Sequence, residues 1–269
     1  MYGVLMAFEN FVPSKGIAES AWVGLKYFDR FIHSYQFSAL FVNTLGLSLY
    51  LLVATFPLPI ILALTFNRLR SKALRGAIQT ISYAPHFISV VVVVSMMSIF
   101  LAPTSGLVNF IAQAFGEKTV NYMAEPSWFK SLYVLSDVWQ HTGWNSIIYF
   151  AALSAIDPEL YDAAKVDGAG AWRQVLNIEL PALAPTIVVL LILNTGSIIN
   201  VGFEKTYLMQ NALNLSSSEV IATYVYKVGL QSLQYSYSAA IGLFTNVISF
   251  VLLAAVNGFA KKVGGESLW

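Results

Sequence analysis

The chain contains no cysteine and few charged side chains. Only 11% of its 269 residues are Asp, Glu, Lys or Arg, whereas soluble domains carry about 25%. The absence of cysteine excludes disulfides, thiolate catalysis and cysteine-ligated metal sites. A net charge of +1 offers no basic excess for nucleic acid. Because 57% of the residues are hydrophobic, the composition is that of an integral membrane protein.

Long runs without charge locate the expected membrane spans. Runs of at least 18 residues lacking Asp, Glu, Lys and Arg cover 31–67, 76–116, 138–156, 180–203 and 228–260. About 20 helical residues cross a hydrocarbon core of about 30 Å. We therefore predict an all-α integral membrane protein with five transmembrane helices, over about 40–66, 77–101, 134–156, 182–203 and 237–260.

The basic residues predict the orientation of these spans. Three connections, 67–76, 157–181 and 261–269, hold eight of the 15 Lys and Arg residues. The positive-inside rule places these connections in the cytoplasm. Residues 1–39 then form an external lead segment, without the features of a signal peptide, ahead of a transmembrane domain over 40–269.

Residues 157–181, DPELYDAAKVDGAGAWRQVLNIELP, interrupt the apolar sequence with an ordered polar loop. Asp157 is a typical N-cap, Pro158 suits the first helical position, and Glu159 is favourable in the first turn. Gly168 predicts the end of this helix, because glycine readily adopts the positive φ of a bend. A second short helical stretch is expected to end at Pro181.

The order of residues in this loop resembles a known signature. Asp162, Ala163 and Ala164 are followed by Gly168, Ile178, Leu180 and Pro181, which matches EAA, three residues, G, nine residues, I, one residue, LP. This pattern is similar to the signature loop of membrane subunits of ATP-binding-cassette (ABC) importers, with Asp in place of Glu. In that family the loop forms a coupling helix that docks on the ATPase subunit. The resemblance assigns this interface to Asp162, Ala163, Ala164, Gly168 and Pro181.

Other segments, including MYGVLMAFENFVPSKGI and YVYKVGLQSLQYSYSAAIGLF, resemble permease subunits of carbohydrate importers, particularly those for complex oligosaccharides. The resemblance implies a bacterial plasma (inner) membrane location and four kinds of partner: a second homologous permease, two ATPase subunits, an external sugar-binding protein and a carbohydrate substrate. Such permeases usually have six membrane helices, and the first would precede the MYG segment.

No phosphate-binding loop of the form G-x-x-x-x-G-K-[ST] occurs in the chain. ATP and Mg²⁺ are therefore expected on the partner ATPase, and this chain is predicted to be a transport subunit without a cofactor and not an enzyme. His33, His86 and His141 lack metal-ligand spacing, so no metal site is predicted.

Polar and aromatic residues in or near the spans are the candidates for the substrate pathway. Aromatic rings can cover the C–H face of a sugar, and amides can pair with its hydroxyl groups. The candidates are Trp139, Gln140, Trp144, Asn145, Asn194, Asn200, Glu204 and Asn246. The alternative is that the aromatic residues anchor the chain at the membrane interface and the amides form interhelical hydrogen bonds.

Two other functions remain open from the sequence. An ABC importer permease for a non-sugar solute would carry the same loop signature. An ion-coupled secondary transporter usually needs a membrane-buried ionisable residue, and the charge-free runs contain no Asp, Glu, Lys or Arg. The sequence leaves open whether the sugar is neutral or acidic.

Overall fold

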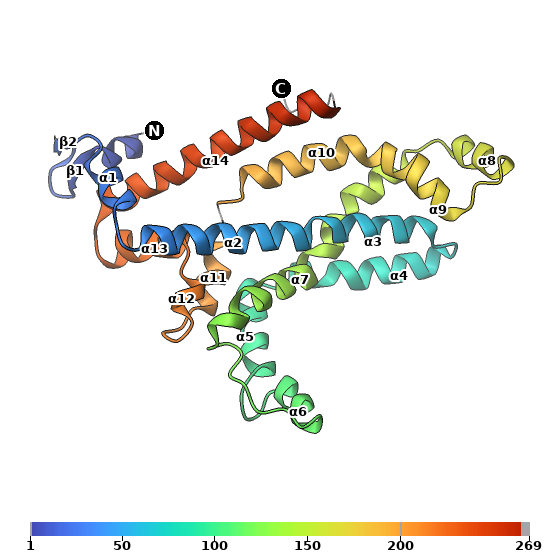
Figure 1. Cartoon of the computed structure of the whole chain (residues 1–269), viewed down its shortest axis with the longest axis horizontal. Coiled ribbons are helices and arrows are strands. Elements are labelled where there is room, and N and C mark those ends of the chain that lie inside the picture. The colour runs from blue at the N-terminus through green and yellow to red at the C-terminus, as the bar shows by residue number, and fades with distance from the viewer. Residues whose placement is uncertain (1, 200, 265–269) are drawn as a thin grey trace. The chain divides into compact units, whose positions relative to one another are not determined.

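The computed structural model describes residues 2–199 and 201–264, and this part of the chain is mainly helical (Figure 1). The α-helices are α1 (Lys26–Ile32), α2 (Phe37–Thr55), α3 (Pro57–Arg68), α4 (Lys72–Tyr83), α5 (Val90–Phe100), α6 (Leu107–Ala114), α7 (Pro126–Ser154), α8 (Pro158–Val166), α9 (Ala171–Gln174), α10 (Leu180–Gly196), α11 (Phe203–Met209), α12 (Leu215–Ser218), α13 (Ile221–Tyr226) and α14 (Tyr235–Gly264). Shorter turns are the 3₁₀-helices η1 (Tyr2–Ala7) and η2 (Ala84–Phe87) and the π-helices η3 (Val175–Glu179) and η4 (Lys227–Gln231). The predicted helical architecture is confirmed.

The N-terminal segment adds a small hairpin that the sequence analysis did not predict. Strands β1 (Glu9–Val12) and β2 (Gly16–Trp22) pair antiparallel, with a register irregularity between Asn10 and Val12. The backbone N–H of Phe11 donates to Ser236 Oγ at 2.9 Å. This bond attaches the hairpin to the start of α14.

The described residues form two compact units. The first unit draws on Met1–Leu49, Val90–Tyr133 and Gly196–Leu253, and the second on Tyr50–Ser89, Val134–Thr195 and Ala254–Trp269. Buried side chains at the centre of the first unit are Phe31, Leu40, Ile199, Ile221, Tyr224, Val228, Tyr237 and Ile241. Those of the second are Ala63, Tyr149, Leu153 and Leu183. Each site described below lies within one unit.

Three helices of the described chain are long and apolar enough to cross a membrane: Phe37–Arg68, Ala171–Gly196 and Tyr235–Lys262. They contain most of the predicted spans 40–66, 182–203 and 237–260, although α10 ends at Gly196 and leaves the last residues of the second of these outside the helix. The predicted span 134–156 lies mainly in α7, which has sufficient length but is rich in polar residues. The count of five spans therefore stays a prediction.

The predicted span 77–101 is not one straight helix. Lys72–Phe87 and Val90–Phe100 are bent by 96° relative to one another. Pro85 in η2 has no N–H to donate, and Ile88 adopts an extended conformation with ψ 129°. Gln140 Nε2 donates to the Ile88 carbonyl at 2.8 Å, so this partly buried backbone acceptor keeps a hydrogen-bond partner at the break.

The helix through Pro181 continues past the point where the sequence analysis predicted its end. The expected end at Pro181 is wrong, since α9, η3 and α10 form one helix over Ala171–Gly196. Pro181 cannot donate the usual backbone hydrogen bond to the preceding turn. The π-helical turn immediately before Leu180 widens the helix at this position, which is a common way to absorb such a defect.

Candidate functional site

The polar loop 157–181 begins with a well-capped helix. Asp157 Oδ1 accepts a hydrogen bond from the Glu159 N–H at 2.9 Å, and Pro158 occupies the first position of α8. Glu159 lies in the first turn, and Lys165 lies in the last. Both charges complement the helix dipole. The helix start predicted from the sequence is confirmed.

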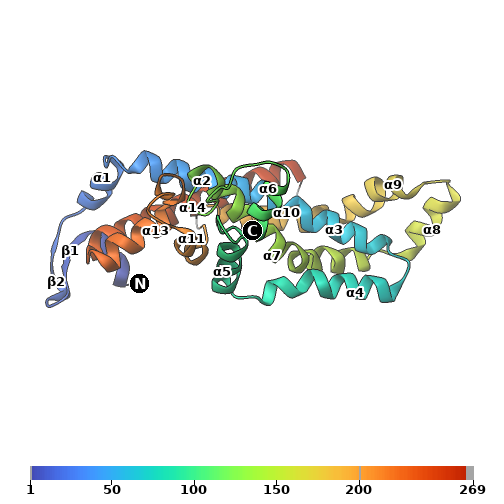
Figure 2. The same ribbon diagram turned by 90° about the horizontal axis from the view of Figure 1, so that it is seen from below.

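A paired C-terminal cap ends α8 at Gly168. The Gly168 N–H donates to the Lys165 carbonyl at 3.0 Å, and the Ala169 N–H donates to the Ala164 carbonyl at 2.8 Å. Gly168 has a φ of +72°, which is favourable only for glycine. The backbone therefore reverses direction at a fixed point, and α8 and α9 are separate helices joined by this turn (Figure 2).

Much of this loop is exposed within the chain. Asp162 pairs with Lys165 at 2.8 Å, and their side chains are 73% and 64% exposed. Ala163, Gly168 and Pro181 are also exposed, whereas Ala164 is half-buried. The loop further exposes four large apolar side chains: Leu160, Val166, Trp172 and Leu176.

Beneath this surface lies a buried polar network that the sequence analysis missed. Glu179 is fully buried, and its Oε1 lies 3.0 Å from Arg68 Nη2. The same oxygen accepts from Asn67 Nδ2 at 2.8 Å and from Tyr161 OH at 3.3 Å. Glu179 is the last charged residue of the polar loop and directly precedes the charge-free run 180–203, so its position in the sequence gave no sign of burial.

The network extends from Arg68 to the bend after α8. Arg68 Nη1 donates to Gln174 Oε1 at 3.0 Å, and Gln174 Nε2 donates to the Ala169 carbonyl at 3.1 Å. Burial is the main reason why the pKa of Tyr161 is raised, and the nearby Glu179 carboxylate also raises it. Tyr161 therefore stays protonated at neutral pH and can donate to Glu179.

The second unit also contains a cavity of about 540 Å³. Its lining residues are Thr55, Phe56, Pro59, Trp144, Asn145, Ile147, Ile148, Tyr149, Leu190 and Asn194. Three of the sequence-predicted pathway residues, Trp144, Asn145 and Asn194, are thus brought together. One face of the Trp144 ring stacks on His86, with centroids 4.4 Å apart and the planes 1° from parallel. The cavity combines aromatic, aliphatic and amide groups, which suits a sugar ring.

The other predicted pathway residues are placed differently. Gln140 is buried and holds the Ile88 carbonyl at the break of the second predicted span. Trp139, Glu204 and Asn246 are exposed on α7, α11 and α14. None of these four is among the residues that line the cavity in the described chain. Asn200 lies outside the described residues.

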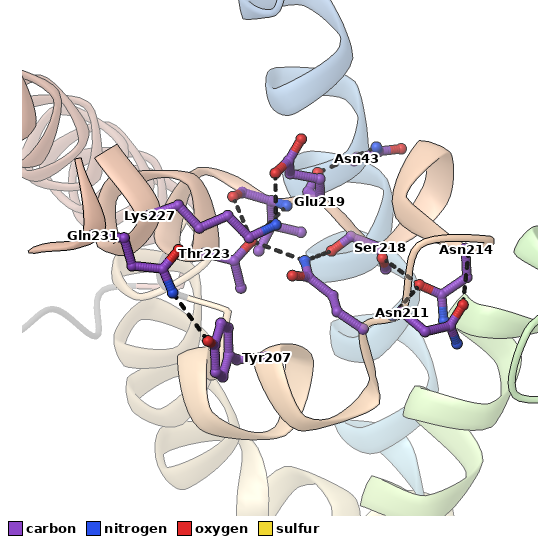
Figure 3. A network of polar contacts seen from close by, with 11 residues as sticks. Asn43, Tyr207, Asn211, Asn214, Ser218, Glu219, Thr223, Lys227 and Gln231 are labelled. Carbon is purple, nitrogen blue, oxygen red and sulfur yellow. Dashed lines mark hydrogen bonds and ion pairs between the residues drawn. The ribbon is translucent and has the colours of Figure 1, made fainter. Parts of the chain in front are cut away.

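The first unit has its own dense polar network (Figure 3). The side chain of Asn214 donates to the carbonyls of Met123 and Met209 at 2.8 and 3.0 Å, and its Oδ1 accepts from Ser218 Oγ at 2.8 Å. Asn43 Nδ2 donates to the Glu219 carbonyl at 3.2 Å. These bonds fix the short helices between α10 and α14 against α2. Such an irregular segment needs side-chain partners for its backbone.

Two charged groups in this segment are also held in place. Lys227 Nζ lies 2.8 Å from Glu219 Oε1. Lys205 is only 4% exposed, with its ammonium 4.7 Å from the centre of the Tyr133 ring. Across the described residues, no group of three His, Cys, Asp or Glu side chains is arranged to hold a metal.

Comparisons with known proteins agree with the loop signature. Residues 55–265 match the family described as "Binding-protein-dependent transport system inner membrane component". The chain is 44% identical over its whole length to the "Polygalacturonan/rhamnogalacturonan transport system permease protein YteP" of Bacillus subtilis (strain 168), of which it covers 84%. It is 41% identical, again over its whole length, to "Protein LplB" of Bacillus subtilis (strain 168), of which it covers 85%.

Solved structures show the same fold. A crystal structure of a bacterial ABC transporter involved in the import of the acidic polysaccharide alginate aligns with a TM-score of 0.90 and 38% identity, over 97% of this chain and 88% of that one. A second, of the bacterial alginate ABC transporter in complex with alginate pentasaccharide-bound periplasmic protein, aligns with the same TM-score and identity over 99% and 88%.

Proposed function

This chain belongs to the family of inner membrane components of binding-protein-dependent transport systems, and on that premise we propose that it forms the translocation pathway of an ATP-driven importer for oligosaccharides or polysaccharide fragments. The chain is a membrane permease component rather than the catalyst, and it works with a substrate-binding protein. Its further partners are a second permease and two ATPase subunits that bind ATP and Mg²⁺. In this arrangement the 157–181 loop faces the cytoplasm.

The observation that carries the proposal is the form of the 157–181 loop. Helix α8 is fixed at both ends by its own caps, yet Val166 and Trp172 are 89% and 72% exposed. Large exposed apolar side chains on an ordered helical loop favour docking to another protein. The residues proposed to contact the ATPase are Asp162, Ala163, Ala164, Gly168 and Pro181.

The substrate class rests on the relatives and on the cavity. Of the relatives named above, YteP is described as a permease protein for polygalacturonan/rhamnogalacturonan transport, and the solved transporter imports alginate. The cavity offers the Trp144 ring beside the amides of Asn145 and Asn194. We therefore propose these three residues as sugar contacts. Trp139, Gln140, Glu204 and Asn246 are not among the described residues that line the cavity, and Asn200 lies outside the described residues.

Co-purification tests the assembly directly. The chain is isolated from native membranes in mild detergent, and its partners are identified by mass spectrometry. We expect an ATPase, a second permease and a sugar-binding protein. A binding protein that retains a peptide would instead establish a permease for another solute. Uptake that collapses with the proton gradient at constant ATP would establish a secondary transporter.

Substitution of Trp144 tests the proposed sugar contact. We expect Trp144→Ala to raise the KM for uptake about tenfold, the factor that corresponds to losing about 1.4 kcal/mol of binding. The matched control is Trp128→Ala, which removes an exposed Trp from the same helix and should leave the KM unchanged. Equal KM values for Trp144→Ala and the unsubstituted protein would exclude Trp144 from the pathway.

A further inference from the structure

The buried network around Glu179 connects three elements of the second unit. Asn67 and Arg68 lie at the end of α3, Tyr161 lies on α8, and Glu179 precedes α10. Glu179 Oε1 accepts hydrogen bonds from Asn67 and Tyr161 and forms an ion pair with Arg68. The end of α3 lies beside α9 in both views (Figures 1 and 2), as the bond from Arg68 to Gln174 requires.

We infer that Glu179 is a positioning residue for transport, which makes α8 and the adjoining ends of α3 and α10 move together when the ATPase displaces the loop. This inference rests on the proposed function. The Arg68–Glu179 pair supplies the mechanical connection, and Asn67 and Tyr161 hold the carboxylate in place.

Burial makes this connection stiff. The Glu179 side chain is 0% exposed, whereas the Arg68 side chain is 30% exposed. A carboxylate that is cut off from water depends on its protein partners, so separating it from Arg68 is strongly unfavourable. If α8 shifts, the favourable response is for the adjoining ends of α3 and α10 to shift with it. An exposed pair such as Asp162–Lys165 would exchange its contact for water and transmit little.

The hydrogen bonds of Gln174 also fix the orientation of the loop at the bend after α8. Gln174 accepts from Arg68 and donates to the Ala169 carbonyl, which lies directly after the cap of α8. Arg68 thus contacts the carboxylate directly and is connected to the bend through Gln174. A lysine at position 68 would keep the charge but lose the planar arrangement of two separate donors.

The test uses the complete transporter in lipid nanodiscs, with a polygalacturonan fragment on its binding protein. The sugar transported per ATP hydrolysed is measured for Glu179→Gln, with Glu117→Gln as the control because Glu117 is exposed. For Glu179→Gln we expect assembled complex and continued ATP hydrolysis, but about tenfold less sugar per ATP, within the usual range of coupling between sites. Glu179→Asp, which keeps the charge, should recover part of the ratio.

An unchanged ratio in Glu179→Gln would overturn the inference, and so would a loss explained entirely by a lower amount of complex. If Glu179→Gln does not assemble, Tyr161→Phe decides, because it removes only the hydroxyl that bonds Glu179 and Asn67. A reduced ratio in that variant supports the inference, and an unchanged one contradicts it. If the unsubstituted chain binds no ATPase, the proposed function itself is contradicted. This outcome separates a failure of the proposed function from a failure of the inference about Glu179.

Discussion

Gly168→Asp is expected to abolish uptake while leaving the chain in the membrane. Gly168 has a φ of +72°, a left-handed conformation that costs most residues about 1–2 kcal/mol and that Asp tolerates better than most of them. The new carboxylate also adds to the negative charge of Asp162 and Asp167 on the same surface. Since about 1.4 kcal/mol changes a binding equilibrium tenfold, we expect ATPase docking to weaken at least to that extent. Uptake and ATPase co-purification are the measurements.

Gly170→Asp is the matched control for this experiment. It adds the same charge two residues further on, where the backbone is extended with φ −68° and ψ 168° and where Gly170 already serves as the N-cap of α9. Aspartate is favourable at that position. If both variants lose uptake equally, charge alone explains the effect. Normal uptake by Gly168→Asp would contradict the role of this bend in docking.

Gly143→Val is expected to prevent stable folding of the second unit. A Cβ added at Gly143 on α7 would overlap the carbonyl of Ser82 on α4. The obstacle is backbone, which cannot rotate away as a flexible side chain can. Overpacking usually costs about 1–3 kcal/mol, and this site is expected at or above the upper end of that range. The measurements are the amount of chain in the membrane and its thermal stability in detergent.

Gly76→Ala provides the comparison, because a Cβ at Gly76 on the same α4 meets nothing within 4 Å. This variant should be as stable as the unsubstituted chain or slightly more stable, since alanine favours a helix over glycine. Wild-type stability of Gly143→Val would show that α4 and α7 do not approach each other this closely.

The sequence by itself determined the class of protein and the local form of its central loop. Charge-free runs required membrane helices, since ionisable groups are costly in hydrocarbon. Asp157, Pro158 and Gly168 set the limits of α8, because capping and positive φ depend on neighbouring residues alone. The motif around Asp162 pointed to the family that the comparisons then established.

Only the tertiary structure decided which polar residues meet. Glu179 and Arg68 are far apart in the sequence, and no local pattern shows that they form a buried pair. Gln140 donates to the Ile88 carbonyl, 52 residues away in the sequence, while Trp144, Asn145 and Asn194 line one cavity. The physical reason is that helix periodicity fixes the face on which a side chain lies, whereas its partners depend on how distant helices pack together.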